Sequence, residues 1–170
     1  MKVFGIAGWS GSGKTTLLVR LIPALTRLGI RVATIKHTHH NPAVGDADSR
    51  ALAAAGATEI LMASPRRFAL IHELDDRPEP LLDELIGHCV DADLVLIEGF
   101  KWSPHPKLEV WDPELGKSML ALTEPSVVAL AADRPVADLD LPHFCRDDAD
   151  GIAMFIAAYC RLPAEASRPV

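Results

Sequence analysis

The chain has 170 residues, 49% of them apolar and 24% charged, which is typical of a single globular domain and excludes a disordered chain. Its 17 lysines and arginines and 23 acids give a net charge of −6 without a basic block, which argues against a nucleic-acid-binding or anionic-membrane surface. The three cysteines have no CxxC spacing, which predicts reduced thiols. The sequence also has no signal-peptide pattern and no apolar run of ~18 residues, so we expect a soluble, cytoplasmic protein.

Strand-like and helix-like segments alternate along the chain. An apolar run predicts a strand at 2–7, and leucines at helical spacing predict a helix over 14–28, with Gly29 at its C-terminal cap. Pro23 should kink this helix or mark its outer face. Further strands are predicted at 30–35, 58–63, 68–72 (the last two forming a possible hairpin), 93–97, 107–110 and 127–131, and further helices at 48–55, 80–90 and 149–161. This alternation predicts an α/β fold with a mostly parallel sheet and helices on both faces.

A glycine-rich segment joins the first predicted strand to the first predicted helix. Residues 8–15, Gly-Trp-Ser-Gly-Ser-Gly-Lys-Thr, match the pattern G-x-x-x-x-G-K-[ST] in full, and we call them the phosphate loop. Such glycines let backbone N–H groups converge on phosphate oxygens, and the helix start adds its positive dipole end. Lys14 would reach the β- and γ-phosphates and Thr15 would ligate Mg²⁺. A turn that serves only packing is the alternative. The predicted nucleotide-contacting positions are Gly8, Ser10, Gly11, Ser12, Gly13, Lys14 and Thr15.

An acid stands at each end of the predicted strand at 93–97. Ligands of open α/β sheets lie at the carboxyl ends of the strands, so Glu98 is the candidate for holding Mg²⁺ through a water or for orienting an attacking water. Asp93 should cap the far end of the strand. Gly99 would let the backbone approach a γ-phosphate, or it only makes a turn. Lys14 and Glu98 are therefore the predicted catalytic residues, and Thr15 and Glu98 the predicted metal ligands, with a solvated carboxylate as the alternative for Glu98.

Three histidines follow the predicted strand at 30–35 in the segment Ile-Lys-His-Thr-His-His-Asn, residues 35–41. H-x-H-H without a nearby cysteine or HExxH helix is a weak metal signature. We therefore expect Lys36 and His37 to face a polyphosphate or an anionic partner. A metal site and a plain surface loop remain open as alternatives.

The segments GWSGSGKTTL, KHTHH, DSR, DLVLIEGFK and PKLEVW together resemble the MobB family of molybdopterin-guanine dinucleotide biosynthesis adaptor proteins, over about residues 2–135. The resemblance implies a small P-loop protein, a homodimer, that binds GTP with Mg²⁺ and hydrolyses it slowly. It also implies a partner, the guanylyltransferase that attaches GMP to molybdopterin. The positions that it carries over, besides the glycines of the phosphate loop, are Lys14, Thr15, Thr16, Lys36, His37, His39, His40, Asp48, Ser49, Arg50, Glu98, Gly99 and Lys101.

The chain departs from the family pattern at three places. Asn41 replaces an acid, the loop over 42–47 is short, and Trp111-Asp112 stands where an arginine usually follows the strand. These changes leave open how the histidine loop contributes to the γ-phosphate site and to partner binding. The phosphate loop itself is unaffected, and we expect a nucleotide-binding domain over 1–162 with a flexible tail at 163–170.

The base of the nucleotide is weakly encoded. Asn41 is the only asparagine and no lysine has an aspartate two residues later, so the guanine-reading motif N-K-x-D is absent. Asp133, after the predicted strand at 127–131, is the candidate because a carboxylate suits the donors of guanine better than it suits adenine. An aspartate that starts a turn before Arg134-Pro135 is the alternative.

Three function classes follow from these observations. The first is a GTP-binding adaptor with weak hydrolysis. The second is a small-molecule kinase using ATP: residues 99–125 hold no arginine for a closing lid, but Arg66 and Arg67 could substitute. The third is a metallochaperone-like GTPase that uses His37, His39 and His40. In the first class, no arginine is an obvious stabilising group from within the chain, although Arg50 could serve.

Overall fold

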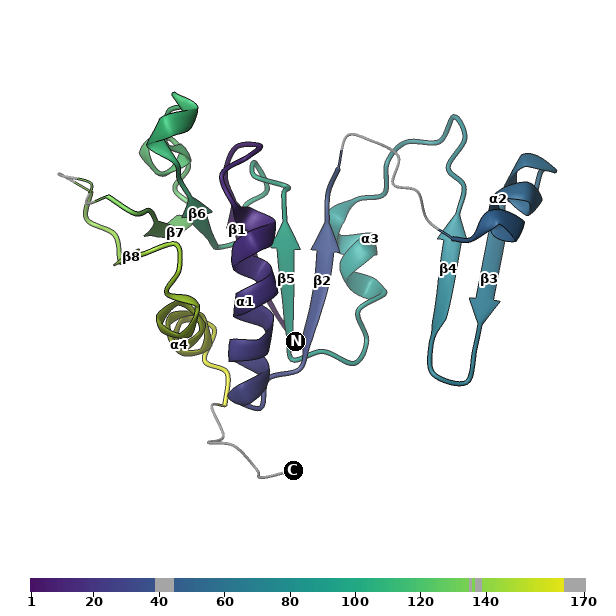
Figure 1. Ribbon diagram of the computed structural model, residues 1–170, viewed down its shortest axis with the longest axis horizontal. Coiled ribbons are helices and arrows are strands. Elements are labelled where there is room, and N and C mark those ends of the chain that lie inside the picture. The colour runs from purple at the N-terminus through teal and green to yellow at the C-terminus, as the bar shows by residue number, and fades with distance from the viewer. Residues whose placement is uncertain (39–44, 135, 137–138, 164–170) are drawn as a thin grey trace. The chain divides into compact units, whose positions relative to one another are not determined.

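The computed structural model in Figure 1 describes residues 1–38, 45–134, 136 and 139–163. The described residues form two compact units. One unit contains residues 1–37 and the residues from 82 onward, and the other contains residues 38–81. Each unit is described separately below.

The larger unit is built on a six-stranded sheet with the strand order β2-β5-β1-β6-β7-β8. Every ladder in it is parallel, so the carboxyl ends of all six strands meet at one edge. The α/β fold with a mostly parallel sheet is thereby confirmed. The strands are β1 (Lys2–Ala7), β2 (Val32–Lys36), β5 (Leu94–Glu98), β6 (Lys107–Val110), β7 (Val127–Ala131) and β8 (His143–Phe144).

Two helices, α1 (Lys14–Arg27) and α4 (Ala149–Tyr159), pack against each other and against one face of this sheet (Figure 1). Their apolar stripes explain the packing, because residues at helical spacing on both helices are completely buried against alternate residues of β1 and β5. The exposed Pro23 lies on the outer side of α1, as one of the two sequence-based alternatives predicted. The fully buried side chains at this interface are Phe4, Ile6, Leu21, Leu25, Leu94, Leu96, Ile152 and Ile156.

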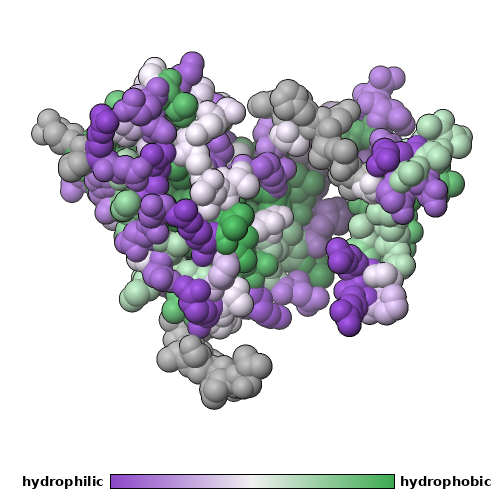
Figure 2. Space-filling model, in the orientation of Figure 1, coloured by the Kyte–Doolittle hydropathy of each residue, from purple (hydrophilic) through white to green (hydrophobic). Residues whose placement is uncertain are grey.

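The smaller unit consists of α2 (Ala47–Ala54) and an antiparallel hairpin of β3 (Glu59–Ala63) and β4 (Phe68–His72). The predicted hairpin is confirmed. Asp46 caps α2, its carboxylate accepting a hydrogen bond from the Ser49 backbone N–H at 2.9 Å. Figure 2 shows apolar atoms over the hairpin, where Leu61, Phe68 and Leu70 are all exposed.

The sequence prediction differs from the structure in short elements. Helix α3 (Leu82–Gly87) is shorter than the predicted 80–90 and buries no residue, so its apolar pattern has no core to hold a longer helix. Strand β8 and the 3-10 helices η1 (Pro113–Leu115) and η2 (Leu120–Leu122) were not predicted, because two or three residues carry no periodicity. No helix of the described residues is long and apolar enough to cross a membrane.

Candidate functional site

The phosphate loop lies at the carboxyl edge of the sheet, between the central strand β1 and the start of α1. Gly8 and Gly13 both have left-handed backbones, with φ of 139° and 95°. A Cβ at Gly8 would lie 2.4 Å from the Val110 carbonyl oxygen, so only glycine allows the loop to pass this close to β6. Gly13 is the N-cap of α1 and has no side chain to satisfy the first N–H groups of the helix, which leaves them for an anion.

Two polar side chains lie within the loop. Lys14 is partly buried, and its Nζ donates to the Trp9 carbonyl oxygen at 2.8 Å. Burial lowers the pKa of Lys14, while the nearby Glu98 carboxylate acts in the opposite direction. The Ser12 hydroxyl is buried and has no hydrogen-bond partner among the described residues. A desolvated ammonium and an unsatisfied hydroxyl inside a glycine-rich loop suit a polyanion.

Three side chains from three elements converge beside the loop. The Thr15 hydroxyl lies 2.9 and 3.1 Å from the two carboxylate oxygens of Glu98, at the end of β5. Lys36, at the end of β2, places its Nζ 3.2 Å from both the Thr15 hydroxyl and one Glu98 oxygen. Glu98 is only 8% exposed. A hydroxyl and a carboxylate are hard oxygen ligands, so Thr15 and Glu98 fit a Mg²⁺ ion next to bound phosphates.

Asp93 lies at the opposite end of β5, as the sequence predicted. Its carboxylate pairs with Arg31, with a closest N–O distance of 2.8 Å. Hydrogen bonds from the Arg31 side chain and backbone lower the pKa of Asp93 to about 2. This acid therefore joins β2 to β5 at the end of the sheet away from the phosphate loop.

His37 lies beside the end of β5. Its backbone N–H donates to the Glu98 carbonyl oxygen at 2.9 Å, and its ring lies 4.6 Å from the ring of Phe100, centroid to centroid. Gly99 has φ of 101°, and a Cβ there would come within 2.8 Å of the His37 Cβ. The close approach of these two loops thus requires a glycine at 99.

The remaining predicted site residues are distributed over both units. Thr16 lies exposed in the first turn of α1. Asp48, Ser49 and Arg50 belong to α2 in the smaller unit, where Arg50 donates to the Gly45 carbonyl oxygen. His39 and His40 lie outside the described residues. Within the described parts of the chain, no group of three or more histidines, cysteines or acids could hold a metal ion.

Trp9, a residue of the phosphate loop, contacts a backbone carbonyl and two lysines. Its indole N–H donates to the Ser118 carbonyl oxygen at 2.8 Å. Lys101 places its Nζ 3.9 Å from the centroid of the same ring, and Lys117 lies 5.8 Å away. These cation–π contacts hold Lys101 close to the loop. Lys101, Lys14 and Lys36 thus gather positive charge at the loop, although the chain is acidic overall.

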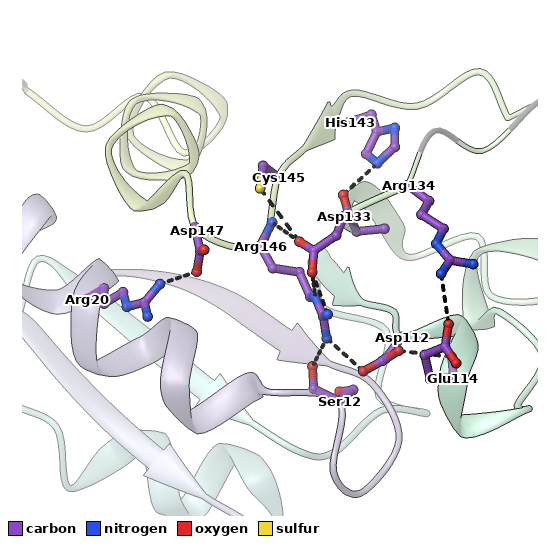
Figure 3. Close-up of polar contacts among 11 residues, drawn as sticks. Ser12, Arg20, Asp112, Glu114, Asp133, Arg134, His143, Cys145, Arg146 and Asp147 are labelled. Carbon is purple, nitrogen blue, oxygen red and sulfur yellow. Dashed lines mark hydrogen bonds and ion pairs between the residues drawn. The ribbon is translucent and has the colours of Figure 1, made fainter.

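On the other side of the loop, Asp133 takes part in an ion-pair cluster that the sequence analysis missed (Figure 3). Its carboxylate accepts from Arg146 at 2.8 and 2.5 Å, and the same guanidinium donates to Asp112 at 2.9 Å. The third partner of Arg146 is the Ser12 carbonyl oxygen, at 3.5 Å. No signal in the sequence pointed to Arg146, because its partners are distant in the chain and β8, which precedes it, is only two residues long.

This cluster changes the protonation equilibria of its members. Arg146 lowers the pKa of Asp133, and the Glu114 backbone N–H together with Arg146 lowers that of Asp112. Both carboxylates are therefore ionised at neutral pH. Trp111-Asp112 stands where an arginine usually follows the strand in the family pattern, and in this chain Asp112 pairs with Arg146, which follows β8.

Comparison with known proteins identifies the family. The family model for MobB, molybdopterin guanine dinucleotide synthesis protein B, matches residues 3–133. The chain is 38% identical over 162 residues to the molybdopterin-guanine dinucleotide biosynthesis adapter protein of Escherichia coli (strain K12), a match that covers 92% of both chains. It is 40% identical over 139 residues to the adapter protein of Haemophilus influenzae, covering 79% of this chain and 76% of that one.

Solved structures agree with this result. A crystal structure of molybdopterin-guanine biosynthesis protein B aligns with a TM-score of 0.73 and 31% identity, over 92% of this chain and 99% of that chain. A MobB homologue from Bacillus stearothermophilus aligns with a TM-score of 0.71 and 26% identity, over 95% and 99% of the two chains. Since the family model spans most of the residues and relatives match nearly end to end, the chain belongs to the MobB family.

Proposed function

We propose that this protein binds GTP together with Mg²⁺, hydrolyses it slowly, and acts as an adapter in the biosynthesis of molybdopterin-guanine dinucleotide. The observation that carries the proposal is the phosphate loop with the Thr15–Glu98 pair at its edge. The adapter role is supported by the names of the Escherichia coli and Haemophilus influenzae relatives. A guanylyltransferase that attaches GMP to molybdopterin is the proposed partner.

Each residue of the site has a distinct task in this proposal. Lys14 and the N–H groups of the phosphate loop bind the phosphates and stabilise charge on the departing phosphoryl group. Thr15 holds Mg²⁺ directly and Glu98 holds it through a water or orients the attacking water. The metal neutralises negative charge on the terminal phosphates when it is bound. Lys36 and His37 contribute positive charge or hydrogen bonds at the terminal-phosphate end.

Slow turnover is expected from the surroundings of the loop. Stabilising the transition state of phosphoryl transfer usually takes an arginine directed at the terminal phosphate. In the described part of the larger unit, Arg146 is the arginine that reaches the loop, and two carboxylates already hold it. A partner that completes the site would raise the rate, which suits an adapter. A small-molecule kinase using ATP is the alternative that nucleotide preference would distinguish.

The proposed setting is a nucleotide-binding domain over residues 1–162 in a cytoplasmic homodimer. The three cysteines are unpaired, which suits a reducing compartment. The exposed apolar side chains of the β3–β4 hairpin support self-association, because an apolar face of this kind is usually covered by a partner.

Calorimetric titration tests the proposal. GTP, ATP and their diphosphates are titrated with and without Mg²⁺, and we expect GTP to bind selectively and in a Mg²⁺-dependent way. Lys14→Ala should weaken triphosphate binding by about 1.5–3 kcal/mol, the usual value for hydrogen bonds to a charged group. Unchanged affinity in a folded Lys14→Ala variant would remove the basis of the proposal. A clear preference for ATP would favour the kinase.

A further inference from the structure

The arrangement of the sheet indicates where the nucleoside end of a bound nucleotide lies. The Thr15–Glu98–Lys36 group marks the terminal-phosphate end, over β5 and β2. The phosphate loop follows β1, the next strand in the sheet. Beyond it, at the same carboxyl edge, come the ends of β6, β7 and β8. A triphosphate that runs through the loop from the β5 side therefore directs its nucleoside toward these three strand ends.

Each of these three strand ends contributes one charged residue to a single cluster: Asp112 after β6, Asp133 after β7 and Arg146 after β8 (Figure 3). The guanidinium bridges the two carboxylates, which would otherwise repel each other. It also reaches the Ser12 carbonyl oxygen, which belongs to the phosphate loop itself. One side chain thus sets the position of the β7 end relative to the loop that holds the phosphates.

The charge of the cluster indicates what it recognises. Two carboxylates and one guanidinium leave a net charge of −1, which disfavours phosphate and favours hydrogen-bond donors. The side chain of Asp133 is 47% exposed, whereas those of Asp112 and Arg146 are 18% and 28% exposed. Asp133 is therefore the member that can still accept from a ligand. Among the described residues, its Oδ1 receives only the Arg146 backbone N–H and the weak thiol donor of Cys145.

We propose that Arg146 is a positioning residue for base selection: it fixes the Asp133 carboxylate relative to the phosphate loop, so that Asp133 accepts from the N1–H and the amino group of guanine. Adenine has no matching donor pair. This inference rests on the proposed binding of GTP and explains how the chain selects guanine without an N-K-x-D motif. The planar guanidinium of arginine is needed, because its Nε and Nη2 donate to one oxygen of Asp133 while its Nη1 donates to Asp112, and a lysine cannot bridge both carboxylates in the same way.

The test separates the base from the phosphates. GTP, ATP and Mg²⁺-tripolyphosphate, which has no base, are titrated into the full chain and its variants. Arg146→Ala should weaken GTP binding about 10- to 100-fold, the effect of losing a charge-assisted hydrogen bond, and tripolyphosphate binding by less than about 3-fold. Arg146→Lys should retain an intermediate preference for GTP over ATP. Asp133→Asn should weaken GTP and strengthen xanthosine triphosphate, whose 2-oxo group accepts from the new amide.

Arg20→Ala is the matched control, because Arg20 forms an ion pair with Asp147, the residue next to Arg146, and lies on α1 outside the phosphate loop. It should leave the affinities for all three ligands unchanged. Thermal melting without nucleotide checks the fold of each variant. If Arg146→Ala does not fold, Arg146→Lys and Asp133→Asn carry the test.

The outcomes are distinguishable. Equal losses of GTP and tripolyphosphate affinity in Arg146→Ala would overturn base selection, since Arg146 would then act only on the phosphate loop. A wild-type chain that binds tripolyphosphate and GTP without preferring GTP over ATP would overturn this inference but not nucleotide binding. A wild-type chain that binds none of the three ligands would overturn the proposed function as well.

Discussion

Replacing Glu98 by glutamine tests the metal end of the site. The two side chains have nearly the same shape, so the change removes the carboxylate charge and little else. If Glu98 holds Mg²⁺ through a water, its charge contributes only when the metal is bound. Glu98→Gln should therefore reduce the gain in GTP affinity that Mg²⁺ produces, and should slow hydrolysis more than it weakens binding.

The contacts of Glu98 set the size of the expected effects. The Lys36 side chain is 56% exposed, so the loss of its ion pair with Glu98 costs only about 0–1 kcal/mol of stability. The Thr15 hydroxyl can still donate to the amide oxygen of glutamine. The free energy of unfolding should thus change by no more than about 1 kcal/mol. The interaction with the metal is charge-assisted, so its loss should reduce the Mg²⁺-dependent gain about 10- to 100-fold.

The assay is calorimetric titration of GTP over a series of Mg²⁺ concentrations, combined with phosphate release under saturating GTP. Glu109→Gln is the control. Glu109 is a completely buried acid on β6, on the other side of β1 from β5, and it accepts from the backbone N–H groups of Leu120 and Ala121 at 2.8 and 2.9 Å. This variant should lose stability but keep the Mg²⁺ dependence. The reasoning is refuted if Glu98→Gln folds and shows the same Mg²⁺-dependent gain and hydrolysis rate as the wild type.

Three further predictions concern other parts of the chain. Both ring nitrogens of His105 are buried without hydrogen-bond partners among the described residues, and burial together with Lys107 lowers its pKa to about 4. Between pH 6.5 and 4 the unfolded chain therefore binds a proton that the folded chain does not. Stability should fall as pH drops through this window, by on the order of 1–2 kcal/mol at pH 5, and denaturant unfolding of His105→Gln should show a smaller loss. Phe68, exposed on the hairpin, should support the proposed homodimer, so Phe68→Asp should shift sedimentation toward the monomer; an unchanged dimer would place the interface elsewhere. A variant with alanine at His37, His39 and His40 should bind Zn²⁺ and Ni²⁺ as weakly as the wild type does, and tight binding that this variant abolishes would favour the metallochaperone alternative.

The sequence by itself determined the phosphate loop and its surroundings. Residues 8–15 are contiguous, and the residue types that the pattern specifies stand at the required spacing, so the spacing alone identifies the loop. Glu98 could be placed because the strand before it is entirely apolar and parallel strands end at one edge of the sheet. The sequence also showed that Asp112 departs from the family pattern, but it did not show that Asp112 would pair with Arg146.

Only the tertiary structure brought Arg146 to the phosphate loop. Its partners Asp133, Asp112 and Ser12 lie 13, 34 and 134 residues away in the chain. The strand that positions it has two residues, too few for any periodic pattern. Similarly, η2 depends on the buried carboxylate of Glu109, 11 residues earlier. Local spacing predicts structures that form through local geometry, whereas contacts between distant strand ends depend on how the sheet assembles.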